Sequence, residues 1–137
     1  MTIDSGVVFL PCADLRRTEE FYHGLLGLPV AQAQGDNLLI FDTGYGFWGF
    51  CRYADGRPPL SGPRGVCLSL NLGSRAAVDA VYARLRDRCR VHRAPARHPA
   101  FPVYSFFALD PDGYLVEFQK LDDPQGLPRR AAVIGED

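Results

Sequence analysis

The chain has 137 residues, of which 47% are hydrophobic and 23% are charged, and its formal net charge is −1. This length suits one domain of ordinary size, and the balanced charge argues against nucleic acid or an acidic membrane as a partner. No run of about 20 apolar residues is present to span a bilayer, and no basic segment precedes the first apolar run as in an export signal. We therefore expect a globular protein of the cytoplasm.

Four cysteines are present, namely Cys12, Cys51, Cys67 and Cys89. None forms a CxxC pair, so the spacing indicates neither a zinc ribbon nor a thioredoxin-like site. Without an export signal, we expect them to be reduced thiols in the cytoplasm.

One pattern occurs twice in the chain, at residues 6–27 and 65–86. A shift of 60 residues pairs Val7 with Cys67 and Asp14 with Ser74. Each copy predicts a short apolar strand, a capping residue and an amphipathic helix. Asp and Ser suit the cap because their side-chain oxygens can accept from the unpaired first-turn amides.

Strand-like runs separated by turn signals follow each predicted helix. They lie at about residues 29–34, 37–42 and 47–53 in the first copy, and at about 90–94, 103–109 and 114–121 in the second. Each half is therefore predicted to be βαβββ.

The predicted organisation is a single domain of residues 1–121 followed by a tail of residues 122–137. Within the domain, module one spans about residues 5–53 and module two about 66–121, joined by a connector at 54–65 rich in proline and glycine. The tail has no clear period and is interpreted as either frayed or an arm that lies on a partner.

The last predicted strand carries one carboxylate, Glu117. Because strand side chains alternate between faces, Glu117 shares a face with Leu115 and Gln119, while Val116 and Phe118 share the other. A carboxylate in this position needs water, a hydrogen-bond donor or a metal.

Two motifs, "ADLRRTEEFYHGLLGLPV" after the first strand and "DPDGYLVEFQ" near the end, carry a family resemblance. The chain resembles the vicinal oxygen chelate superfamily, which includes glyoxalase I, bleomycin-resistance proteins and extradiol dioxygenases, over about residues 7–121. The resemblance implies an α+β fold in which two βαβββ modules in tandem have curled mixed sheets that enclose a cavity. Short members commonly dimerise, so we expect a homodimer.

In metal-using members, the resemblance implies four ligands, from the first and fourth strands of each module, around a divalent ion that chelates two adjacent substrate oxygens. The matching positions here are Val7, Phe50 (Cys51 after a one-residue slip), Cys67 and Glu117. A hard divalent ion prefers several oxygen or imidazole ligands, and only Glu117 offers one. We therefore expect no functional metal. If a metal is present, we expect a divalent cation at Glu117 and Cys67.

The roles of these two residues remain open at this point. Glu117 is either a ligand anchor or catalytic general base on the cavity floor, or a structural carboxylate paired with an arginine or exposed at a sheet edge. Cys67 shares its predicted face with Ser69 and Asn71. It is either a soft ligand or nucleophile, or a small residue of the cavity wall.

The stretch "TGYGFWGFCRY" is the most aromatic of the chain, and Trp48, Phe50 and Arg52 share one face of its predicted strand. Matching to the family positions puts this face towards the cavity, where the aromatic rings would stack on a ligand and Arg52 would meet an anion. The alternative is that the rings fill the core. The layout that the resemblance implies also brings Tyr104 and Phe106 close to the cavity.

Three functions are compatible with these features. The first is binding of a small aromatic or amphipathic molecule without a functional metal. Its expected ligand-binding residues are Trp48, Phe50, Arg52, Cys67, Ser69, Tyr104 and Phe106. The second is a metal-dependent or Glu117-based lyase, isomerase or dioxygenase, and the third is a purely structural or regulatory partner protein.

Overall fold

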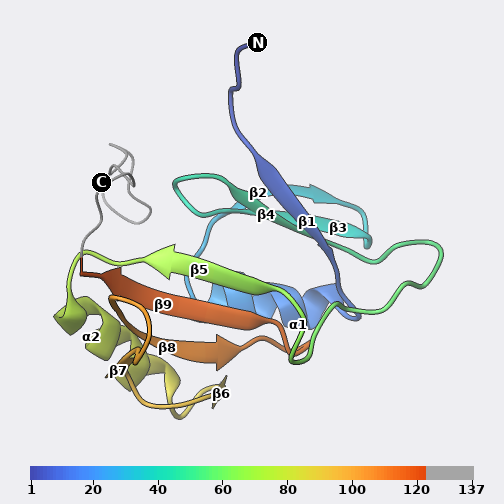
Figure 1. Cartoon of the computed structure of the whole chain (residues 1–137). Coiled ribbons are helices and arrows are strands. Elements are labelled where there is room, and N and C mark those ends of the chain that lie inside the picture. The colour runs from blue at the N-terminus through green and yellow to red at the C-terminus, as the bar shows by residue number, and fades with distance from the viewer. Residues whose placement is uncertain (123–137) are drawn as a thin grey trace. The chain divides into compact units, whose positions relative to one another are not determined.

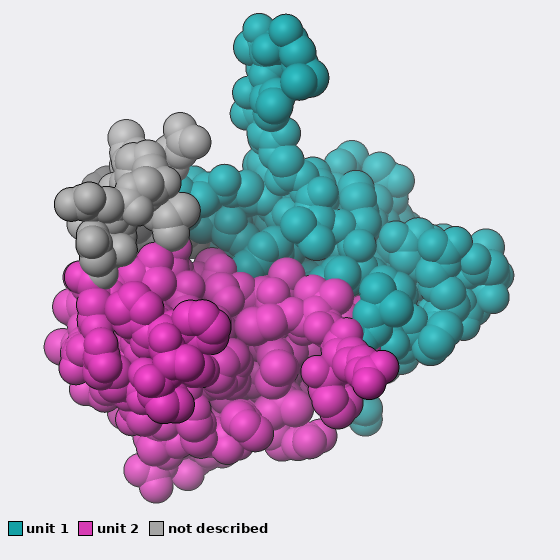
Figure 2. Space-filling view, in the orientation of Figure 1, with its two compact units in different colours: residues 1–60, 129–137 teal, residues 61–128 magenta. Residues whose placement is uncertain are grey.

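The computed structural model describes residues 1–122, which fall into two compact units (Figure 2). Unit 1 comprises Met1–Leu60, and unit 2 begins at Ser61, within the predicted connector. All of the predicted tail except Asp122 lies outside the described residues. Each unit combines one mixed sheet with helical structure, so the expected α+β class is confirmed.

Unit 1 follows the predicted βαβββ order (Figure 1). Its sheet has the order β1-β4-β3-β2, in which β1 and β4 are parallel and the other pairs are antiparallel. Its elements are β1 (Val7–Pro11), α1 (Leu15–Glu19), the π-helix η1 (Glu20–Leu25), β2 (Val30–Gln34), β3 (Leu38–Asp42) and β4 (Phe47–Cys51).

Unit 2 repeats this topology with the sheet order β5-β9-β8-β6, and β5 and β9 form its parallel pair. The strand predicted at residues 90–94 is instead two short strands, β6 and β7, which both pair with β8. The elements of unit 2 are β5 (Cys67–Asn71), α2 (Arg75–Leu85), β6 (Arg90–Val91), β7 (Ala96–Arg97), β8 (Val103–Leu109) and β9 (Leu115–Leu121).

Both predicted helix caps are confirmed. The Oδ1 of Asp14 accepts from the backbone N–H groups of Arg16 and Arg17 at 3.0 and 3.3 Å. Ser74 Oγ accepts from the N–H of Ala77 at 3.0 Å. The two caps are 60 residues apart, as are the first residues of β1 and β5, so the sequence repeat corresponds to a structural repeat.

In each unit, one sheet face packs against the unit's own helix through a tyrosine. Tyr22 stacks on the ring of Phe50 at 4.5 Å in unit 1. Tyr82 meets the ring of Phe106 edge-on at 5.3 Å in unit 2, and Phe106 stacks on Phe118. These rings, all buried except the half-buried Tyr82, belong to the two cores, and Figure 1 shows α2 running along β9 and β8.

The turn between β8 and β9 sets the register of the site. Asp110 Oδ1 accepts from the N–H groups of Asp112 and Tyr114, and Gly113 takes the positive φ of +89° that this turn requires. The pairing that follows places Phe107 directly opposite Glu117. A slip of one residue would move Phe107 to the other face of the sheet.

No helix within residues 1–122 is both long and apolar enough to cross a membrane.

Candidate functional site

The face of the unit 2 sheet that α2 does not cover is called the open face here. On β9, Val116 and Phe118 are buried on the helix side, while Glu117 lies half-buried on the open face, as the alternation predicted. Leu68 of β5 is likewise buried. The polar and aromatic side chains of the open face are Cys67, Ser69 and Asn71 of β5, Glu117 and Gln119 of β9, and Ser105 and Phe107 of β8.

Glu117 is held by a neutral donor from the adjacent strand. Its Oε1 accepts from Ser69 Oγ at 2.7 Å, and the two residues are register partners in the parallel pair of β5 and β9. The next pair along these strands, Gln119 and Asn71, is joined by an amide hydrogen bond of 2.8 Å. Ser69 therefore orients the carboxylate, and a second polar pair lies beside it along the same two strands.

Cys67 ends this row of polar side chains, with its Sγ 3.7 Å from Ser69 Oγ. Burial raises the pKa of the Cys67 thiol, and the negative charge of Glu117 raises it further, although the Ser69 hydrogen bond acts in the opposite direction. The raised pKa keeps the thiol protonated near neutral pH. Since the thiolate is the nucleophile, the open face does not activate Cys67 for attack.

Tyr104 and Phe106, which the resemblance placed close to the cavity as ligand-binding residues, do not lie on the open face of this sheet. The hydroxyl of Tyr104 donates to Asp79 of α2 at 2.5 Å. Phe106 is fully buried between Tyr82 and Phe118. Both therefore face the helix, and the aromatic residue of β8 on the open face is Phe107.

The same correction applies to Trp48 and Phe50 of β4. Phe50 is fully buried under Tyr22, and Trp48 meets that tyrosine edge-on at 6.1 Å. Both rings thus fill the core of unit 1, which was the alternative interpretation. Arg52 lies one residue beyond the end of β4 and is exposed, and its predicted contact with a ligand anion remains a prediction.

The strand registers also correct one family position. In unit 2, Cys67 pairs with Leu115 and Ser69 pairs with Glu117. In unit 1, Val7 pairs with Phe47 and Phe9 pairs with Gly49. Superposing the two patterns makes Gly49 the counterpart of Glu117, in place of Phe50 or Cys51.

Gly49 leaves room for an aromatic ring of its neighbour on β1. A Cβ at Gly49 would lie 2.7 and 2.8 Å from ring carbons of Phe9 and 3.3 Å from a methyl of Val7. With this register, the resemblance places the four ligand positions of metal-using members at Val7, Gly49, Cys67 and Glu117. This set offers one carboxylate and one thiol, which does not fit a hard divalent ion that prefers several oxygen or imidazole ligands.

Within residues 1–122, no group of three or more His, Cys, Asp or Glu side chains could hold a metal ion. The expectation that the protein has no functional metal stays a prediction.

Arg93 is a residue of the open face that the sequence analysis missed. Between the pairs Val91–Ala108 and Ala96–Ser105, four residues (92–95) stand opposite two (106 and 107), so the strand bulges. The bulge places the Arg93 guanidinium 5.5 Å from the centre of the Phe107 ring. Pro95, which has no N–H to donate to the ladder, was the available signal for this interruption.

Three oxygens fix the Arg93 guanidinium. Its Nη1 donates to the backbone oxygens of Ser105 at 2.6 Å and of Ala94 at 3.2 Å, and its Nη2 donates to Ser105 Oγ at 3.3 Å. The ring of His92 meets Phe107 edge-on at 6.2 Å. A cation and an aromatic ring therefore lie next to the strand that carries Glu117.

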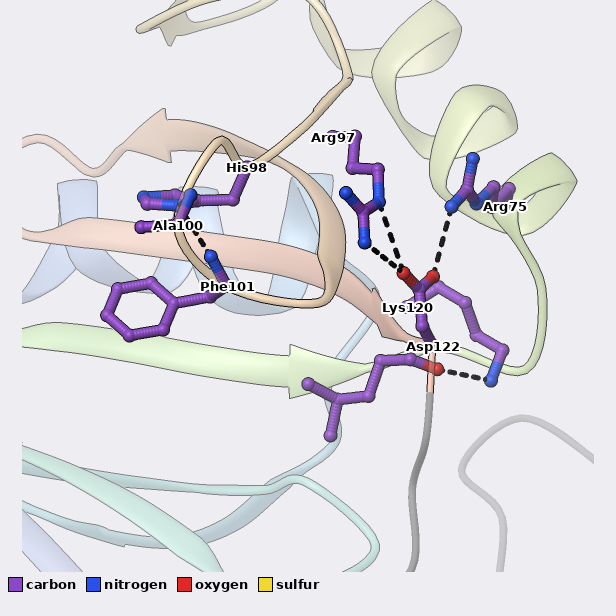
Figure 3. Close-up of polar contacts among 8 residues, drawn as sticks. Arg75, Arg97, His98, Ala100, Phe101, Lys120 and Asp122 are labelled. Atoms are coloured by element: carbon purple, nitrogen blue, oxygen red, sulfur yellow. Dashed lines mark hydrogen bonds and ion pairs between the residues drawn. The ribbon is translucent and has the colours of Figure 1, made fainter.

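A second polar cluster holds the end of β9 (Figure 3). Asp122 forms ion pairs with Arg75 of α2 at 3.0 Å and with Arg97 of β7 at 3.3 Å, and these two cations lower the pKa of its carboxyl. His98 Nδ1 accepts from the N–H groups of Ala100 and Phe101. Both arrangements serve the local structure of a strand end and a loop.

The fold consists of two duplicated βαβββ units, and in each unit the first and last strands are parallel neighbours. The last strand of the second unit carries the carboxylate of Glu117. The model of the glyoxalase/bleomycin resistance protein/dioxygenase superfamily matches residues 5–118. The chain belongs to this superfamily.

Solved structures of the superfamily share the fold at low sequence identity. A glyoxalase/bleomycin resistance protein/dioxygenase from Nocardioides is 21% identical with a TM-score of 0.72, and the match covers 95% of this chain and 90% of the Nocardioides chain. The corresponding protein from Alicyclobacillus acidocaldarius is 18% identical with a TM-score of 0.73, over 91% and 96%. A lactoylglutathione lyase from Agrobacterium tumefaciens is 21% identical with a TM-score of 0.67, over 83% and 90%. No curated protein matches the chain.

Proposed function

We propose that this protein binds a small aromatic or amphipathic molecule on the open face of unit 2, without a functional metal. The observation that carries the proposal is the environment of Glu117. Its carboxylate accepts from the Ser69 hydroxyl, while the positions of unit 1 that correspond to Ser69 and Glu117 are Phe9 and Gly49. These side chains are better suited to binding an organic ligand than to coordinating a metal ion.

The proposed binding residues follow from the corrected faces. Cys67 and Ser69 remain in the set, and Phe107 and Arg93 take the place of Tyr104 and Phe106. Phe107 supplies the aromatic surface, and Arg93 and Glu117 supply opposite charges that orient a ligand. All of these residues belong to unit 2.

Two measurements test this function together. Isothermal titration calorimetry with a panel of aromatic acids, phenols and aromatic amines should find saturable binding that survives extensive treatment with EDTA. Elemental analysis of protein purified without added metal should find less than about a tenth of an equivalent of any divalent ion, because two donors of this kind hold an ion weakly.

Substitutions identify the face that binds. Glu117→Gln should weaken the ligands of the panel that carry a donor by about tenfold, because a hydrogen bond to a charged group is lost. Glu20→Gln is the matched control, because Glu20 is an exposed carboxylate of η1 in unit 1. Absence of any saturable binding, or a stoichiometric ion removed by EDTA together with ligand binding, would contradict the proposal.

A metal-free enzyme is the second candidate, and the geometry of Glu117 favours it over a metal-dependent one. Ser69 occupies Oε1, so Oε2 is the oxygen that would take a proton from a bound substrate. This version requires a measured isomerase or lyase turnover that Glu117→Gln abolishes and Glu20→Gln leaves unchanged.

The same proposal includes a homodimer that acts in the cytoplasm. Within residues 1–122, which include all four cysteines, the structure has no disulfide, and this is compatible with the proposed reducing compartment.

A further inference from the structure

Two opposite charges on the open face of unit 2 have no counter-ion in the part of the chain that the structure describes. Arg93 donates only to neutral oxygens, and Glu117 accepts from a neutral hydroxyl. Among residues 1–122, neither of them takes part in an ion pair. Charges held in place without a partner are suited to a ligand that carries the complementary charges.

The donors that remain on Arg93 have the geometry of a carboxylate clamp. Two of its contacts come from Nη1 and one from Nη2, and within residues 1–122 none comes from Nε. A guanidinium has five N–H donors, so we infer that Nε–H and the second hydrogen of Nη2 are left for a ligand. These two donors are parallel and lie on one edge, which is the arrangement that binds a carboxylate through both oxygens.

Phe107 is the common neighbour of the two charges. It is the register partner of Glu117, and directly opposed side chains on one face have Cβ atoms about 4.5–5.5 Å apart. The Arg93 guanidinium lies 5.5 Å from the centre of the same ring. A ligand that contacts both charges therefore also meets an aromatic surface.

The cation is held before any ligand arrives. The bulge at residues 92–95 and the 2.6 Å bond to the Ser105 carbonyl fix the guanidinium, and the Ser69 hydroxyl fixes the Glu117 carboxylate. Groups that are already ordered lose little conformational entropy on binding, so their charges contribute more of their interaction to affinity.

We propose that the ligand of this face is an aromatic zwitterion, whose carboxylate meets Arg93, whose ammonium group meets Glu117 and whose ring packs against Phe107. This inference rests on the proposed function and names the chemical class of its ligand.

A series of four probes separates the two charges. We would titrate 4-(aminomethyl)benzoate, 4-methylbenzoate, 4-methylbenzylamine and 4-methylbenzyl alcohol into the full chain by calorimetry at pH 7. The zwitterion should bind about tenfold more tightly than either singly charged probe, because each charge adds one charge-assisted contact. The neutral alcohol should bind most weakly.

Variants assign each charge to its residue. Arg93→Gln should remove the advantage of the zwitterion over 4-methylbenzylamine, and Glu117→Gln should remove its advantage over 4-methylbenzoate. Arg16→Gln is the control, because this exposed arginine of α1 pairs only at the surface of unit 1. If Arg93→Gln does not fold, Arg93→Lys keeps the charge but loses the parallel donors, and should weaken the two carboxylate probes selectively.

The outcomes distinguish this inference from the proposed function. Equal affinity for the zwitterion and the neutral alcohol would overturn the inference and leave metal-free binding intact. Failure of all four probes to bind below about 10 mM would also overturn it, since that affinity is only about 2.7 kcal/mol. The broader ligand panel then decides the proposed function separately.

Discussion

The reactivity of Cys67 depends on two neighbours that act in opposite directions. Burial and the charge of Glu117 raise the thiol pKa above its ordinary value of 9.0, and the Ser69 hydrogen bond lowers it. At pH 8 we therefore expect iodoacetamide to alkylate Cys67 more slowly than an unperturbed thiol, with a rate that is still rising above pH 9.0.

Substitutions of Glu117 and Ser69 should change the alkylation rate of Cys67 in opposite directions. Glu117→Gln should speed alkylation, because it removes a negative charge that disfavours the thiolate. Ser69→Ala should slow it, because the Ser69 hydroxyl, which donates to Glu117 in the structure, can turn its hydrogen to the thiolate when the thiol ionises. Peptide mapping by mass spectrometry separates Cys67 from the other three cysteines. A rate that neither variant changes would show that the polar row does not control this thiol.

The alternation of side chains along a strand predicted which residues share a face of the sheet. It could not decide which of the two faces the helix covers. It separated Glu117 from Phe118 correctly. On β4 it grouped Trp48 with Phe50 correctly, yet the matching to the family positions turned that face the wrong way. The true counterpart of Glu117 is Gly49, and a glycine has no side chain to mark its position in a pattern.

At the scale of the element, the two helix caps are independent tests of the repeat. Asp14→Ala and Ser74→Ala should each lower the free energy of unfolding by about 1 kcal/mol, because each removes an acceptor for first-turn amides. Urea denaturation measures both losses. Asp14→Ser and Ser74→Asp keep a capping oxygen and should retain most of the stability.

The caps also indicate how the two units unfold. If the alanine variants each shift a different phase of the denaturation curve, the units unfold separately, and their effects should add in the double variant. A loss well below 0.5 kcal/mol for either alanine variant would contradict the role of that cap.

The elements could be predicted from sequence to a large extent, because caps, turn residues and hydrophobic periods are local signals. The register of β8 against β9 was harder, because it depends on the conformation of the turn at Asp110 and Gly113. Without that register, the face of Phe107 could not be assigned. The bulge that delivers Arg93 likewise depends on how residues 92–95 pair with β8.

At the scale of the whole molecule, β1 is an edge strand with apolar residues exposed on both faces. Val8 and Phe9 are 47% and 49% exposed, and β1 is the first strand in the sheet order of unit 1. Edges of this kind favour pairing with another chain. We therefore expect sedimentation to give about twice the monomer mass of 15.2 kDa at micromolar concentration.

A charge on this edge tests whether the strand is involved. Val8→Lys should shift the protein towards the monomer, because an edge lysine opposes strand pairing. Ile3→Lys is the matched control, since Ile3 is 73% exposed but precedes β1. A wild-type protein that sediments as a monomer of 15.2 kDa would refute the dimer.

The two units share a topology but differ in the chemistry of their uncovered faces. Unit 2 presents Ser69 and Glu117 where unit 1 presents Phe9 and Gly49 at the equivalent positions. At these positions, unit 2 thus presents polar side chains and unit 1 presents an apolar surface. Sequence alone showed the duplication, but the difference became clear only from the registers.

The ring of Phe9 above Gly49 restricts how the first half of this chain can change. Any side chain introduced at position 49 collides with that ring, so a second carboxylate there would require a smaller residue at position 9 as well. Substitutions at the two sites should be strongly non-additive. The difference between the two halves is therefore hard to lose by single substitutions. A side chain at position 49 alone would crowd the Phe9 ring, and a smaller residue at position 9 alone would leave a void, and neither change alone would add a functional group that works.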